Sequence, residues 1–177
     1  EQYNSYFLSE NGSYLSRAVI FKNADSLQKS CYNRYATINN SYFRSYVFYS
    51  IASINASVSR GEAFLINSYI LHQPIQYTHY EYMQFFNACF KGYLNSIASQ
   101  RKGESLYHII NEKSDYKLLS DYAKQDKYLQ NDSLRELVIL RNLWDFYFSS
   151  EFVTESVENI VQQLQLATKN KMHYKIA

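Results

Sequence analysis

The chain has 177 residues, of which 46% are hydrophobic, and its 18 basic and 16 acidic side chains leave a net charge of +2. That length is enough to bury a substantial core in one domain, and the high content of aromatic and aliphatic residues argues against disorder. The balanced charge argues against a dedicated nucleic-acid-binding protein, and no apolar run is long enough to span a bilayer.

The first 24 residues carry the weakest signal, because short helical pieces are interrupted at the turn dipeptide Asn11-Gly12. They are compatible with a lead-in segment. From Asp25 an inward helical stripe is expected, since apolar residues recur every three or four positions at Leu27, Cys31, Tyr35 and Ile38.

The segment Asn39-Asn40-Ser41 is expected to separate this helix from the next, because its side chains can cap a helix start. The second helix carries two neighbouring stripes: Phe43, Val47, Ile51 and Ile54, then Tyr42, Tyr46 and Tyr49. An apolar face of that width predicts packing against two neighbours.

Three segments have the spacing of a capping box, in which a Ser or Thr side chain and a Glu three residues later satisfy the first amides of a helix. They are 59–62, 78–81 and 133–136. The first predicts a short helix through Ile70, and the second a helix from Tyr82 through Ile97 that ends near Gly103. The third is followed by an apolar stripe of Leu137, Val138, Leu140, Trp144 and Tyr147.

Three further helices are expected towards the end of the chain. Leu106, Ile109 and Ile110 mark a short one, Ser114 is the expected cap of a second, and Thr154 is the expected cap of a third. Residues 169–177 predict the start of one more helix, which stops without a cap. We therefore expect a chain cut from a longer polypeptide.

The scarcity of helix breakers decides the fold class. One Pro and four Gly accompany 19 Tyr, 11 Phe and one Trp, and no segment alternates apolar and polar residues as a strand does. The sequence predicts an irregular all-α fold of eight to ten helices without a sheet, as a single domain over residues 1–177.

Cys31 and Cys89 are the only cysteines. Two interpretations stay open: two small buried hydrophobic residues, or a disulfide in an oxidising compartment. Their separation excludes a Cys-x-x-Cys redox pair within the chain.

No constellation predicts a reaction. His108 and Glu112 lie four residues apart on a helix, but two ligands make a weak metal site, and a His beside a solvated Glu is the favoured interpretation. The sequence carries no phosphate loop, nucleophile elbow or zinc signature. We expect no cofactor, no metal and no catalysis by this chain alone, with an unrecognised enzyme site as the open alternative.

Tyrosines provide the candidate binding residues. Most lie on the helical stripes and are expected to pack in the core or at its rim, whereas Tyr80, Tyr107 and Tyr174 lie off the main stripes and could bind a glycan or peptide. Lys169, Lys171, His173 and Lys175 form a basic cluster, favoured as a solvated helix start, with binding of an anionic partner as the alternative.

Three strings carry a resemblance to a known family: YTHYEYMQFFNACF over 77–90, LRELVILRNLWDFYF over 134–148, and the ending HYKIA. They resemble the helical region that precedes the thioredoxin-like domain in TlpA/ResA-type thiol-disulfide oxidoreductases of the Gram-negative cell envelope. The matching residues are Tyr82, Met83, Phe85, Phe86 and Asn87, then 134–140, then His173, Ile176 and Ala177. The likeness covers about residues 40–177.

The resemblance implies a location and a partner. The catalytic Cys-x-x-Cys would lie after Ala177, so no redox residue of the family can be assigned to a position here. The implied compartment is the periplasm or outer cell envelope, with a lipid anchor in the full-length protein. The implied partners are the C-terminal thioredoxin-like domain and an envelope client protein. The alternative is an independent envelope protein that binds a glycan or peptide.

Overall fold

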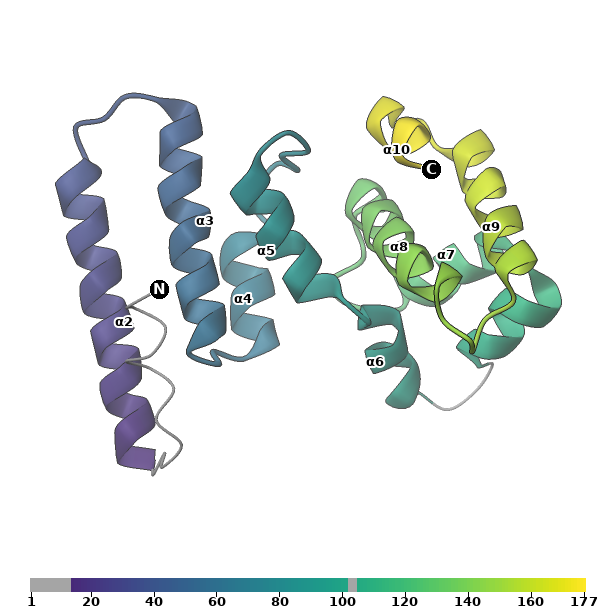
Figure 1. Cartoon of the computed structure of the whole chain (residues 1–177), viewed down its shortest axis with the longest axis horizontal. Helices are drawn as coiled ribbons and strands as arrows, with labels where there is room; N and C mark the ends of the chain where they lie inside the picture. The colour runs from purple at the N-terminus through teal and green to yellow at the C-terminus, as the bar shows by residue number, and fades with distance from the viewer. Residues whose placement is uncertain (1–13, 102–104) are drawn as a thin grey trace. The chain divides into compact units, whose positions relative to one another are not determined.

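The computed structural model describes residues 14–101 and 105–177, which form nine α-helices and one π-helix without a strand among them (Figure 1). The prediction of an all-α fold is therefore confirmed. The chain divides into two compact units, Glu1–Phe85 and Phe86–Ala177. The prediction that they belong to one domain stays a prediction.

The first unit is built from α2 (Tyr14–Tyr35), α3 (Ser41–Ser57), α4 (Glu62–Tyr69) and the first half of α5 (Tyr80–Phe90). Helices α2 and α3 lie side by side and run in opposite directions, and α3 also packs against α4 (Figure 1). Aromatic rings fill much of this core. Tyr49 meets Tyr82 edge to face at 5.0 Å between ring centroids, an arrangement that the ring quadrupoles favour.

The second unit contains α6 (Tyr93–Ser99), the π-helix η1 (His108–Lys113), α7 (Tyr116–Lys124), α8 (Asp132–Tyr147), α9 (Thr154–Ala167) and α10 (Lys171–Ile176). Helix α8 packs against four of these helices: α6, α7, α9 and α10. It is accordingly apolar around most of its circumference, and its buried residues include Leu134, Leu137, Val138, Ile139, Leu140, Leu143 and Phe146.

Three polar side chains on α8 bond neighbouring segments to it, and two of them, Arg135 and Asn142, are buried. Asn142 accepts from the Leu94 amide and donates to the Phe90 carbonyl, both at 3.1 Å. Arg135 donates to the Leu129 carbonyl at 2.9 Å. Glu136 accepts at 2.7 Å from the imidazole of His173 in α10. These bonds satisfy groups that would otherwise be buried without partners.

Helix starts are capped by Asn or Asp more often than the sequence analysis predicted. The expected cap at Asn40 is confirmed, because its side chain accepts from the Phe43 amide at 2.9 Å. Asp115 and Asn131 cap α7 and α8 in the same way. The predictions of Ser114 and Ser133 as caps are wrong, since Asx side chains one residue later and two residues earlier occupy those positions.

The other two capping boxes are also absent. Gly61, not Ser59, is the N-cap of α4, and Ser59 has a φ of 59°, outside the extended conformation that an N-cap residue adopts. Helix α5 begins at Tyr80, so Thr78 lies in the preceding turn.

Two helix lengths differ from expectation. Helix α2 begins at Tyr14, so the helix whose clear signal starts at Asp25 is longer than expected. Residues 1–13, including the expected interruption at Asn11-Gly12, lie outside the described residues. The single helix expected from Tyr82 to Ile97 is interrupted by Gly92 at a φ of 63°, which glycine adopts without steric cost.

Candidate functional site

A groove of about 410 Å³ lies in the first unit, between α2, α3 and the connection that precedes α5. Its floor and walls are mainly apolar and aromatic: Tyr32, Tyr35, Ala36, Phe43, Val47 and Phe48. The volume falls within the range of about 300–1,000 Å³ that is usual for small-molecule sites. We call this feature the α2–α3 groove.

The groove exists because α2 buries little of its predicted inward stripe. Leu27 and Ile38 are exposed, contrary to expectation, while Cys31 and Tyr35 are half-buried. Tyr35 meets Phe43 edge to face at 5.3 Å, so the two helices touch at this end through rings. Large rings hold helix backbones apart, and the apolar walls beside them stay accessible.

Polar groups at the groove rim are available for a ligand. The Arg44 side chain is oriented by its Nε, which donates to the Ile38 carbonyl at 3.0 Å. Its two terminal nitrogens have no partner among the described residues, and neither do the side-chain amides of Gln73 and Gln76. Among the described residues that line the groove, Arg44 is the only charged one.

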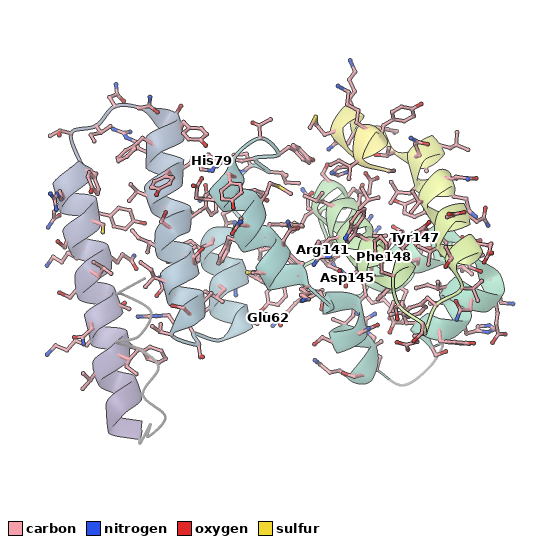
Figure 2. All side chains as sticks on the ribbon, viewed as in Figure 1. Glu62, His79, Arg141, Asp145, Tyr147 and Phe148 are labelled. Atoms are coloured by element: carbon pink, nitrogen blue, oxygen red, sulfur yellow. The ribbon has the colours of Figure 1, made fainter. Side chains whose placement is uncertain are left out.

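The connection that carries Gln73 and Gln76 is held against α3 by His79. This buried imidazole donates from Nε2 to the Tyr42 carbonyl across 3.1 Å and stacks on the Tyr42 ring at 4.3 Å between centroids. Its Nδ1 lies 3.4 Å from the Glu81 carboxylate. His79 is labelled in Figure 2, near the start of α5. The rim glutamines therefore sit on an anchored segment.

A second exposed surface lies at the end of α8 and consists of Trp144, Tyr147 and Phe148, which we call the α8 aromatic cluster. Trp144 is 66% exposed and Phe148 68%, and the Phe148 ring packs against both of the others at 5.2 and 5.0 Å. The sequence pattern predicts Trp144 and Tyr147 on an inward stripe. That prediction is wrong for both residues, because Leu143 and Phe146 take the buried positions of the same turns.

The three tyrosines singled out from the sequence are exposed: Tyr80 by 64%, Tyr107 by 48% and Tyr174 by 54%. They begin α5, precede η1 and lie in α10. None of them lines the α2–α3 groove. Tyr174 borders a smaller hollow of about 280 Å³ beside Lys169, Lys171 and Lys175. Their role in binding stays a prediction.

The basic cluster near the end of the chain loses one of its members. His173 is fully buried and pairs with Glu136, so it belongs to the core rather than to a solvated helix start. Lys169, Lys171 and Lys175 remain exposed. A single sequence could not distinguish His173 from its neighbours, because its acidic partner lies 37 residues away.

The remaining candidates pair within the fold. His108 and Glu112 face each other on η1 at 2.7 Å, which supports the favoured interpretation of a His beside a solvated Glu. Cys31 and Cys89 are both half-buried, and no disulfide joins them in the structure. No cluster of three or more His, Cys, Asp or Glu with metal-binding geometry occurs in the described part of the chain.

The buried phenol of Tyr49 makes the stability of the fold depend on pH in the alkaline range. Burial raises its pKa to about 12, and its hydroxyl has no hydrogen-bond partner among the described residues. An unfolded tyrosine ionises near pH 10, so the stabilisation from neutral Tyr49 is complete below pH 10 and is lost as the pH rises to about 12.

We therefore expect Tyr49→Phe to raise the free energy of unfolding by about 1 kcal/mol at pH 7, because it removes a polar group that is buried without a partner. It should also reduce the loss of stability between pH 10 and 12. Urea unfolding across that pH range measures both. Tyr69→Phe is the matched control and should destabilise, because it removes the bond from Asn55 at 2.8 Å. Equal changes in the free energy of unfolding at pH 7 for the two variants would contradict the prediction.

Comparison with known proteins gives no relative: no family model, no curated protein and no solved structure matches the chain. Among the described residues, no helix has both the length and the apolar content needed to cross a membrane.

Proposed function

We propose that this chain is a non-catalytic helical scaffold and partner-binding domain of a cell-envelope thioredoxin-like protein, a thiol-disulfide oxidoreductase in its full-length form. The α8 aromatic cluster carries the proposal. Soluble proteins usually bury such residues, and exposed Trp and Tyr are enriched where one protein binds another. The only Trp of the chain lies in this cluster.

The position of the resembling strings supports the family part of the proposal. Tyr82, Phe85 and Phe86 are buried in α5. The stretch 134–140 forms the inward-facing start of α8, and His173 pairs with Glu136 of that helix. A segment that determines packing is the kind that a shared helical scaffold would preserve.

The proposed partner of the α8 aromatic cluster is the redox domain of the same polypeptide. Helix α8 holds the cluster in a fixed position, because four neighbouring helices pack against α8. Arg141 and Asp145 form an ion pair at 2.7 Å. They precede Trp144 and Phe148 by three residues each, so the helical spacing places them on the same side of α8 as the cluster. An aromatic centre with a charged rim is the usual composition of a protein interface.

The full-length protein tests this proposal. We expect the native gene to encode, after Ala177, a thioredoxin-like domain with a Cys-x-x-Cys pair, and the full-length protein to reduce insulin while residues 1–177 do not. The redox domain added separately should change the fluorescence of Trp144 and protect the α8 aromatic cluster from hydrogen exchange.

Phe148→Ala should weaken that binding by at least about tenfold, as expected for an interface anchor. Leu166→Ala is the control, since Leu166 is a strongly exposed apolar residue on α9 outside the cluster. A gene without a redox dithiol, or reduction of insulin by residues 1–177 alone, would overturn the proposal.

The second candidate function is that of an independent envelope protein that binds a glycan or a peptide. The observation in its favour is the α2–α3 groove, with its aromatic walls and unbonded polar rim.

A further inference from the structure

We infer that the α2–α3 groove is a binding site for a short acidic saccharide, a sugar that carries a carboxylate. The inference deepens the second candidate function and does not depend on the scaffold proposal. It assigns a ligand class to residues that were not among the binding candidates expected from the sequence.

The aromatic walls supply the first part of the recognition. Tyr32 is exposed along the groove, and Tyr35 and Phe43 are half-buried in it, so ring surface is available to a ligand. A sugar ring has an apolar face of C–H groups that can pack on an aromatic ring, while its hydroxyl groups point outward to polar partners. The Tyr32, Tyr35 and Phe43 side chains are already positioned by their helices, so little ordering is needed on binding.

The polar side chains at the groove rim supply the second part of the recognition, the hydrogen bonds to the sugar. The planar amides of Gln73 and Gln76 each offer a donor and an acceptor side by side, which matches neighbouring hydroxyl groups on a sugar. Both amides are unbonded among the described residues, and the buried His79 holds their segment in place. A peptide helix would need a longer apolar trough than a groove of about 410 Å³ provides.

The charge of the rim selects an acidic sugar. In the part of the lining that the structure describes, Arg44 is the only charged side chain and no carboxylate is present. The bond from its Nε to the Ile38 carbonyl fixes the guanidinium plane, so the two terminal nitrogens can bind both oxygens of a carboxylate. Such paired, charge-assisted bonds are among the stronger polar contacts in proteins.

An oligosaccharide array in which each uronate-containing member has a neutral counterpart tests this inference on the whole chain. We expect the chain to bind uronate members at least about tenfold more strongly than their counterparts. With digalacturonate, NMR shift changes should centre on Tyr32, Tyr35, Phe43, Gln73 and Gln76. This mapping needs no variant.

Variants then separate the contributions of ring and charge. Tyr32→Ala should weaken binding of digalacturonate about tenfold, while Tyr80→Ala, at an exposed tyrosine of the same unit outside the groove, should not. Arg44→Gln should weaken the binding of digalacturonate about tenfold. It should change the weaker binding of neutral galactobiose by less than about twofold. Lys22→Gln, at an exposed lysine of α2 that does not line the groove, is its control.

Three results would overturn the inference. One is the absence of uronate binding on the array. Another is binding that Tyr80→Ala abolishes and Tyr32→Ala does not. The third is binding of the tripeptide Ala-Phe-Ala in the groove in place of any saccharide, which would reject the sugar while leaving the second candidate function standing.

Discussion

Asn142→Ala should lower the free energy of unfolding by about 2–6 kcal/mol, the largest effect expected of a polar substitution among the described residues. Asn142 is fully buried. Its Oδ1 accepts from the Leu94 amide, in the first turn of α6, and its Nδ2 donates to the Phe90 carbonyl, the last residue of α5. The substitution leaves both backbone groups buried and unpaired, at about 1–3 kcal/mol each.

Asn142 also bonds to backbone groups at the junction of α5 and α6, where intrahelical hydrogen bonds are missing. Helices end with unsatisfied carbonyls and begin with unsatisfied amides, and the left-handed Gly92 separates α5 from α6. One side chain satisfies a group on each side of this break. The amide of Asn142 therefore bonds α8 to the junction of two other helices.

Urea unfolding followed by circular dichroism and by Trp144 fluorescence measures the effect in the unit that contains α8. Asn95→Ala is the matched control, because Asn95 is an exposed residue of α6, one position from Leu94. It should change the free energy of unfolding by less than about 0.5 kcal/mol. Similar midpoints for the two variants would show that the Asn142 bonds do not hold the junction together.

Glu136→Ala should release α10 from α8. The Glu136 carboxylate accepts from His173 Nδ1 and from the Thr168 hydroxyl, both at 2.7 Å. His173 is fully buried, so the alanine variant leaves a buried imidazole without its acidic partner. We expect a cost of about 2 kcal/mol or more, felt mainly as local opening of the six-residue α10.

Hydrogen exchange of the α10 amides is the appropriate measurement, because it reports local opening as well as global unfolding. A cost of about 2 kcal/mol corresponds to a roughly thirtyfold loss of protection. Glu136→Gln should restore part of it, since the amide oxygen still accepts from His173. Glu151→Ala, at an exposed carboxylate in the turn before α9, should leave α10 unchanged. Unaltered protection in Glu136→Ala would contradict this role.

Secondary structure could be predicted from the sequence because it depends on local spacing. The stripe of Val47 and Ile51 in α3 recurs at the helical period and is buried as predicted. The cap at Asn40 has the same local origin. The wrong caps at Ser114 and Ser133 arose where an Asx residue nearby competes for the same helix start.

The candidate sites could not be predicted in this way. Tyr32 and Tyr35 have the same helical spacing as a core stripe, and only the fit of α2 against α3 leaves them beside a groove. Trp144 has the same spacing as the buried stripe of its own helix. Exposure of a ring depends on whether a neighbouring element covers it, and that neighbour is distant in the sequence.

The helical fold class follows from the amino-acid pattern, because one Pro and four Gly leave long segments uninterrupted and the aromatic and aliphatic residues recur every three or four positions. Which of those residues are core and which are surface depends on the tertiary packing. It paired His173 with Glu136 and placed Asn142 against α5 and α6. The physical reason is range: a helix forms through contacts four residues apart, whereas burial and polar pairing join residues dozens of positions apart.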